Sequence, residues 1–238
     1  MFNNNVCCII SEKMKKSLLE IDSIQKYFGD KLLLSDIYLR CETGEIIGLL
    51  GRNGSGKSTL LKIIFGIIPT EHKFVRIDGV VKSSTSKLLS DISYLSQHHF
   101  IPKFLGVRQA ILLTKPKLRQ SEFLADEFIS TFIGKHIHEL SAGELRYLEI
   151  KVGLQNPSAL LDEPFSGLAP LMIQKVREMI RSNSIQKGII ITDHNYENVM
   201  NLSHRNILML DGRTVPIDSP QQLIEHGYLP TIKNSDIF

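Results

Sequence analysis

The sequence of 238 residues has little of three things: cysteine, net charge and long apolar stretches. Its three cysteines, Cys7, Cys8 and Cys41, form neither an even-numbered disulfide framework nor a CxxC metal-binding pair, which indicates a reducing compartment. No apolar run approaches the roughly 20 residues of a membrane-spanning helix, and the start lacks the layout of a secretory signal. We therefore do not expect the chain to cross a bilayer by itself.

The net charge is small because 28 Lys and Arg stand against 25 Asp and Glu, which gives +3. The charges are spread without long basic runs, so nucleic-acid binding has little support. Hydrophobic residues make up 42% and charged residues 22%, the composition of an ordinary globular protein. We expect a single domain over residues 14–238, preceded over residues 1–13 by a disordered extension or a misassigned start.

Short apolar runs alternate with helical patterns, which predicts an α/β fold with a predominantly parallel sheet. IIGLL (46–50), ISYLSQ (92–97), SALLD (158–162) and GIIIT (188–192) are typical of strands buried on both faces. KFVRIDGVV (73–81) carries a DG turn and predicts an antiparallel β flap. A small helical subdomain is expected at about residues 100–140, where Leu124, Phe128 and Phe132 recur at the spacing of one helix face.

GRNGSGKST (51–59) is a full P-loop between a predicted strand and a predicted helix. Its glycines let the backbone fold closely around phosphate oxygens, and amides at the helix start point toward the anion. Lys57 can reach the β- and γ-phosphates, and Ser58 can ligate Mg²⁺. We predict an ATP site formed by Gly51, Arg52, Asn53, Gly54, Ser55, Gly56, Lys57, Ser58 and Thr59, with Lys57 also catalytic.

Two adjacent carboxylates follow the apolar strand in LLDEP. Neighbouring side chains of a strand point in opposite directions, so the two groups can have different roles. We predict that Asp162 holds the Mg²⁺ shell and that Glu163 orients or deprotonates the attacking water.

These motifs together resemble the ATP-binding-cassette (ABC) family over nearly the whole chain, from about Leu18 to Leu229. The resemblance implies a P-loop NTPase fold of the ABC ATPase type. YLSQ places Gln97 at the family's Q-loop, which implies contact with Mg²⁺ or water, and ITDHN places His194 at its switch histidine. LSAGE (140–144) occupies the signature position, which implies ATP contacts for Ser141, Ala142 and Gly143.

The resemblance also implies a stacking partner for adenine at Tyr27 in QKYFGDK, with Phe28 as the neighbouring candidate. Stacking is chemically reasonable because an aromatic face pairs with any base.

In motif style the sequence is most similar to cassettes of lipopolysaccharide export and branched-chain amino-acid uptake. Cassettes of this kind imply ATP and Mg²⁺ as ligands and a transmembrane permease as partner. They also imply a homodimer or a paired ABC ATPase and a place on the cytoplasmic face of the cell membrane. No nucleic-acid partner is expected, because the chain lacks a basic face.

Three positions depart from the family pattern: Ala142 and Glu144 in the signature, and Ala169 where an aspartate is usual. Two functions therefore stay open, a Mg-dependent ATPase that powers a transporter and a regulatory or weakly hydrolysing cassette paired with another ATPase. The S-x-x-E spacing of Ser141 and Glu144 predicts a helix capping box. A carboxylate used in that cap would turn back to its own helix rather than face a phosphate.

Overall fold

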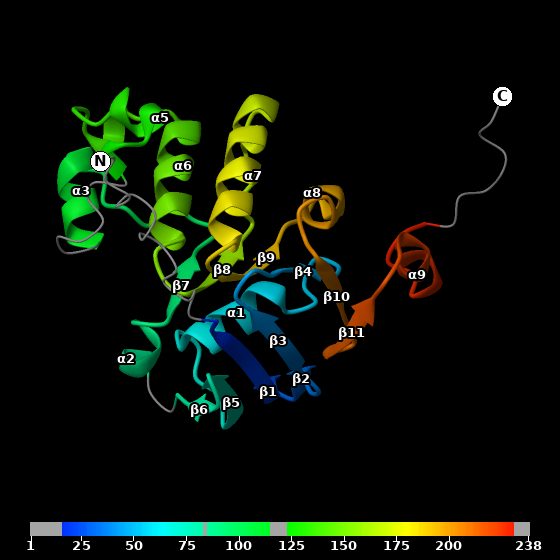
Figure 1. Cartoon of the computed structure of the whole chain (residues 1–238). Helices are drawn as coiled ribbons and strands as arrows, with labels where there is room; N and C mark the ends of the chain where they lie inside the picture. The colour runs from blue at the N-terminus through cyan, green and yellow to red at the C-terminus, as the bar shows by residue number, and fades with distance from the viewer. Residues whose placement is uncertain (1–15, 83–84, 115–122, 231–238) are drawn as a thin grey trace, which may run out of the picture.

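The structure, a computed structural model, describes residues 16–82, 85–114 and 123–230. The extension predicted for residues 1–13 lies outside these ranges. The described residues form two β-sheets with one helix between them and further helices on the far side of the larger sheet (Figure 1). Within this described part, no helix combines the length and the apolarity that crossing a membrane requires.

The larger sheet has six strands in the order β11-β10-β4-β9-β8-β7. Its members are β4 (Ile46–Leu50), β7 (Ile92–Leu95), β8 (Ser158–Asp162), β9 (Gly188–Thr192), β10 (Arg205–Leu210) and β11 (Arg213–Ile217). Neighbouring strands run parallel except β10 and β11, which form an antiparallel hairpin. The predominantly parallel sheet predicted from the sequence is therefore confirmed.

The central strands β4, β8 and β9 are buried along their whole length because both of their faces are covered. In β4, Ile47 and Leu49 belong to the hydrophobic cluster under α1 (Lys57–Phe65), whereas Ile46 and Leu50 belong to a second cluster on the opposite face. Helices α6 (Ala142–Gly153) and α7 (Pro170–Ser184) contribute to that second cluster. Successive side chains of a strand alternate between faces, so the four apolar side chains of β4 are divided between these two cores.

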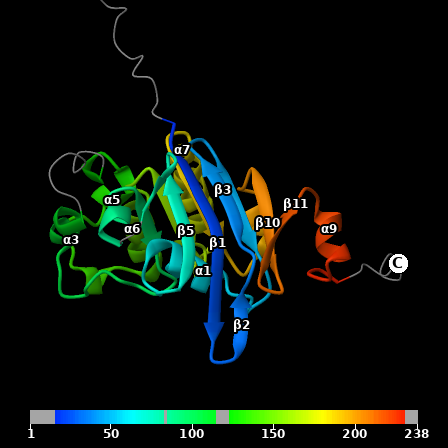
Figure 2. The same cartoon turned by 90° about the horizontal axis from the view of Figure 1, so that it is seen from below.

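The smaller sheet is antiparallel, and β1 is its central strand (Figure 2). It comprises β1 (Leu18–Phe28), β2 (Lys31–Leu34), β3 (Tyr38–Glu42), β5 (His72–Ile77) and β6 (Val80–Val81). The DG hairpin predicted from the sequence is β5-β6, which forms one edge. Helix α1 packs between the two sheets, since its buried residues share one cluster with residues of both.

The remaining helices among the described residues are short. They are α2 (Thr85–Leu88), α3 (Val107–Thr114), α5 (Glu127–Ser130), the 3-10 helix η1 (Ile137–Glu139), α8 (Tyr196–Met200) and α9 (Pro220–Glu225). Most of the region predicted as helical, α3, α5 and η1, lies beside α6 and away from the smaller sheet (Figure 1).

The prediction of one helix face through Leu124, Phe128 and Phe132 is wrong. Asp126 interrupts the pattern because its carboxylate accepts hydrogen bonds from the amides of Phe128 and Ile129, at 3.1 Å each, and so begins a new helix. Leu124 is 49% exposed before this break, whereas Phe132 is buried beyond the end of α5. A strong N-cap at Asp126 outweighs the apolar periodicity.

Gly48, in the middle of β4, tests the close packing of the larger sheet. A Cβ atom there would lie within 3.0 Å of the side chains of Asn206, Val199 and Ser203. Gly48→Ala should therefore destabilise the fold by about 1–3 kcal/mol, which lowers the melting temperature by several degrees in a thermal unfolding experiment. Gly134→Ala is the matched control, because a Cβ there meets nothing within 4 Å. Equal melting temperatures for the two variants would contradict this packing.

Candidate functional site

The carboxyl ends of four neighbouring parallel strands carry the residues predicted for nucleotide chemistry. The P-loop follows β4, Gln97 follows β7, the two carboxylates close β8 and His194 follows β9. Parallel strands in adjacent positions bring such residues to one edge of the sheet. There they border a cleft of ≈ 590 Å³ lined by Leu33, Asn53, Gly54, Gly56, Lys57, Ser58, Thr59, Gln97, Glu163 and His194.

The P-loop backbone leaves the amides at the start of α1 facing the cleft without a side-chain cap. Gly56 is the N-cap of α1 at φ 100°, a left-handed conformation that suits glycine, and makes no side-chain cap bond. Gly51 needs to be small for another reason, because a Cβ there would lie 3.1 Å from the carbonyl oxygen of Met209. A helix start with free amides and a positive dipole end favours an anion.

The Lys57 ammonium lies folded over the loop that precedes it. Its Nζ donates to the carbonyl oxygens of Gly51 at 2.6 Å and Arg52 at 3.2 Å. Burial lowers the pKa of Lys57, and the carboxylates of Glu163 and Asp162 oppose that shift. A lysine placed in this way can exchange the two carbonyl contacts for phosphate oxygens. Arg52 itself points away, since its guanidinium donates to the carbonyl oxygen of Gly227 at 2.5 Å.

Asp162 is fully buried behind the cleft and is held by two hydroxyl groups. Ser58 Oγ donates to Oδ1 at 2.9 Å and the Tyr94 hydroxyl donates to Oδ2 at 3.0 Å. Burial raises the pKa of Asp162, and the two hydrogen bonds act in the opposite direction. One hydroxyl and one carboxylate are the oxygen ligands that suit Mg²⁺ when a nucleotide supplies the rest of the shell, so the residues fit this ion. Tyr94 was not predicted as part of the site, although it stands in the quoted YLSQ.

Glu163, Gln97 and His194 meet around one carboxylate oxygen. Gln97 Nε2 donates to Glu163 Oε2 at 2.9 Å, and His194 Nδ1 lies 3.8 Å from the same oxygen. His194 Nδ1 also lies 3.3 Å from Oδ1 of Asp193. The backbone of Glu163 has φ 49°, which is uncommon for a residue with a side chain and typical of constrained site residues. The structure thus brings together three residues that are far apart in the sequence.

Arg146, which the sequence did not reveal, holds the backbone around Glu163. Its guanidinium is 3% exposed and donates to the carbonyl oxygens of Asp162 at 3.0 Å, Glu163 at 2.9 Å and Ser96 at 2.7 Å. Three carbonyls from two different segments therefore converge on one cation. Burial lowers the pKa of Arg146, but arginine stays charged in proteins.

Glu149, one turn further along α6, balances the charge of Arg146 and was also missed. It is fully buried, and its carboxylate lies 3.5 Å from Arg146 NH1, 2.8 Å from His99 Nδ1 and 2.9 Å from the amide of Phe100. This carboxylate thereby ties α6 to the segment that follows Gln97. The i, i+3 spacing of opposite charges on a helix was the available signal.

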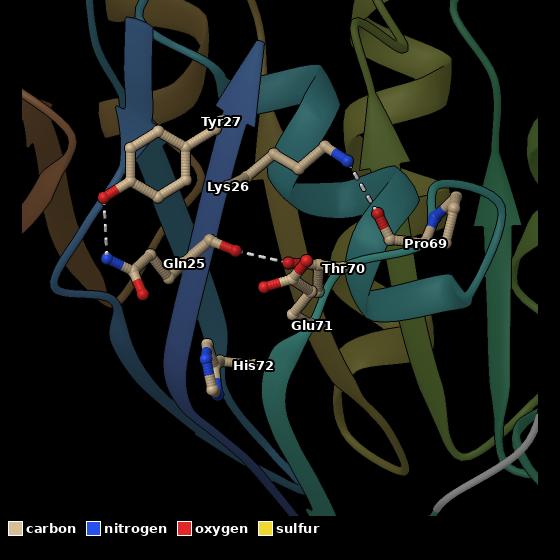
Figure 3. Close-up of a pocket in the computed structure, with 7 residues that line it drawn as sticks. All are labelled: Gln25, Lys26, Tyr27, Pro69, Thr70, Glu71 and His72. Carbon is tan, nitrogen blue, oxygen red and sulfur yellow. Dashed lines mark hydrogen bonds between the residues drawn. The ribbon is translucent and has the colours of Figure 1, made fainter. Parts of the chain in front are cut away.

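Tyr27 does not line the cleft. It lies in a separate surface hollow of ≈ 410 Å³ with Gln25, Lys26, Pro69, Thr70, Glu71 and His72 (Figure 3). Its hydroxyl accepts a hydrogen bond from Gln25 Nε2 at 3.3 Å, while Lys26 points to the other side of β1 and donates to the carbonyl of Pro69. Tyr27 and Phe28 are both about half exposed, so either ring is accessible to a base.

The signature residues Ser141, Ala142 and Gly143 also lie outside the cleft, at the N-terminus of α6. The predicted capping box is confirmed: Ser141 Oγ accepts from the amide of Glu144 at 3.2 Å, and Glu144 Oε2 accepts from the amide of Ser141 at 2.8 Å. Ser141 and Ala142 are exposed. The residues predicted to contact ATP from the signature therefore face outward in the single chain.

Comparison with known proteins places this geometry in a family. The sequence model described as "ABC transporter" matches residues 34–166. The lipopolysaccharide export system ATP-binding protein LptB of Haemophilus influenzae is 31% identical, over 87% of this chain and 93% of that protein. The protein of the same name from Acidithiobacillus ferridurans is 28% identical over 93% and 98%.

The fold has a similar counterpart among solved structures. A structure described as the ATP binding subunit of an ABC transporter superposes with a TM-score of 0.76 at 20% identity, covering 90% of this chain and 95% of that one. This likeness concerns the fold, whereas the matching family model covers more than half of the sequence. The chain thus belongs to the ABC transporter family, as one of its ATP-binding and ATP-hydrolysing subunits.

Proposed function

We propose that the chain hydrolyses ATP at a composite site completed by a second cassette, either another copy or a related ATPase subunit docked head to tail. The observation that carries this proposal is the outward position of Ser141 and Ala142, outside the cleft that the P-loop lines. The cap bonds the amide of Glu144, and the amide of Leu145 bonds the Ser141 carbonyl. The amides of Ala142 and Gly143 are therefore left to meet a phosphate from a partner's nucleotide.

Within one cleft, each residue has a distinct role. Lys57 and the P-loop amides bind the phosphates of ATP, and Glu163 accepts a hydrogen bond from water so that the water oxygen is aimed at the γ-phosphorus. The new oxygen–phosphorus bond forms as the bond to ADP breaks, and the water proton passes to Glu163. Gln97 fixes the Glu163 carboxylate, and His194 lies beside it in a position to contact the γ-phosphate.

Mg²⁺ would be held by Ser58 and Asp162, with Gln97 near enough to contact the ion or its water. The ion would neutralise charge on the phosphates during transfer. Replacing the Ser58 to Asp162 hydrogen bond by two ligand contacts requires only small movements of the side chains, because the two oxygens are 2.9 Å apart.

The membrane partner is a transmembrane permease subunit, which would hold the chain at the inner face of the cell membrane. Both LptB proteins are named for an export system, and this supports the presence of such a partner. ATP binding would close the cassette pair and hydrolysis would reopen it, because contacts to the γ-phosphate exist only before hydrolysis.

One observation favours the alternative of a weakly hydrolysing cassette that pairs with a stronger ATPase. Ala169 is the N-cap of α7 and makes no side-chain cap bond, so the group that an aspartate would offer to a partner is missing. ATPase assays on the isolated chain, with Lys57→Ala as the inactive control, distinguish a fully active ATPase from a weakly hydrolysing cassette. Turnover by the chain alone supports an active homodimer, and turnover only in the presence of a second cassette supports the alternative.

Glu163→Gln should bind ATP but lower its turnover about 10²- to 10⁴-fold, because the amide cannot take the proton of the attacking water. Steady-state phosphate release by the full chain, together with its co-purified membrane partner, measures this loss. The exposed Glu225→Gln on α9 is the control for removing a carboxylate. Turnover by Glu163→Gln at the wild-type rate would contradict its proposed role.

Tyr27→Ala should weaken ATP binding by about five- to a hundredfold, the loss of one stacked base, and leave the affinity for inorganic triphosphate unchanged. Phe28→Ala is the matched comparison, since its ring is equally exposed on the same strand. Titration calorimetry with both ligands distinguishes them. A selective loss in Phe28→Ala instead would assign the stacking to Phe28, and a loss in neither would refute stacking at this strand end.

A further inference from the structure

The carboxylate of Glu144 accepts hydrogen bonds from two donors within its own chain, a backbone amide and a lysine ammonium. Oε2 accepts from the Ser141 amide at 2.8 Å, and Oε1 accepts from Lys135 Nζ at 3.1 Å. The Glu144 side chain is 19% exposed as a result. Its negative charge is therefore held at the first turn of α6 and paired there with Lys135.

We propose that Lys135 is a positioning residue for ATP hydrolysis, because it neutralises Glu144 and keeps the N-terminus of α6 attractive to a phosphate. The inference rests on the proposed composite site, in which that helix end meets the nucleotide of a partner. A free carboxylate in the first turn stabilises its helix but repels an incoming anion at the same place. Pairing with Lys135 removes the repulsion and keeps the cap.

The backbone of Lys135 is fixed, so its ammonium is delivered to a defined place. The amide of Val107 donates to the Lys135 carbonyl at 2.9 Å, and the amide of Lys135 donates to the carbonyl of Phe132 at 3.0 Å. Two residues on, the amide of Ile137 donates to the carbonyl of Leu105 at 2.9 Å. The segment before the signature is thus bonded to the segment that leads into α3.

The ion pair between Lys135 and Glu144 contributes little to the stability of the fold. Lys135 is 43% exposed, and an ion pair at such a site contributes little to the free energy of unfolding. The same pair matters more to an anion that approaches the helix end, because closing a second cassette over it excludes water and weakens screening. A positioning role should therefore change the KM for ATP and leave the melting temperature unchanged.

The test combines charge removal at both ends of the pair. Lys135→Met keeps the length of the side chain and removes its charge, and Glu144→Gln keeps a side chain that suits a capping box. Lys135→Met should raise the KM for ATP about two- to fivefold, the effect of one charge at a helix end, with an unchanged melting temperature. In the Glu144→Gln background the same substitution should have almost no effect, because the amide needs no counter-ion.

Lys82→Met is the matched control, because Lys82 also forms an ion pair, with its Nζ 2.7 Å from Oδ2 of Asp91. This pair lies between β6 and β7 in the sequence, outside α6. It should leave the KM unchanged. The inference is overturned if Lys135→Met matches the wild type, or if its defect persists in the Glu144→Gln background. The proposed function has a separate test. It fails if the wild-type chain with its partner does not hydrolyse ATP, or if Glu163→Gln hydrolyses ATP as fast as the wild type.

Discussion

The buried guanidinium of Arg146 is the contact on which the geometry of the site depends. It binds carbonyls of Ser96, Asp162 and Glu163, and so fixes the ends of β7 and β8 against the helix that carries the signature. Glu149 supplies the counter-charge that makes burial of this cation tolerable. Loss of Arg146 would release the backbone at Glu163, whose φ of 49° needs external support, and loss of Glu149 would remove the carboxylate that balances the buried guanidinium.

The two sheets and the helices around that contact carry different parts of the site. The larger sheet is covered on both faces, so its strands stay rigid and present the P-loop, Asp162, Glu163 and His194 at one edge. Helix α1 links this edge to the antiparallel sheet that carries Tyr27. The signature lies at the start of α6, whose later residues Arg146 and Glu149 reach back to the cleft of the same chain. In the proposed composite site, one helix would therefore serve two nucleotides, its own chain's through side chains and a partner's through its first amides.

The sequence predicted features that depend on local patterns, and it missed those that depend on tertiary contacts. The P-loop, the strand before Asp162 and the capping box at Ser141 follow from spacing and turn chemistry, and all are present. Arg146 and Glu149 were not predicted, because their partners Ser96 and His99 each lie 50 residues away in the sequence. The break at Asp126 shows the reverse error, in which apolar periodicity hid a capping residue. The two-sheet arrangement around α1 likewise needed contacts that no single segment encodes.

The central claim, that each ATP is enclosed by two different chains, is tested most directly by mixing two inactive variants. Lys57→Ala removes the phosphate-binding ammonium, and Ala142→Asp places a negative charge at the exposed signature. Each is expected to be inactive alone. A mixed pair contains one intact site, formed by the P-loop of the Ala142→Asp chain and the signature of the Lys57→Ala chain, so ATP turnover should reappear on mixing. A mixture as inactive as its components would contradict the account.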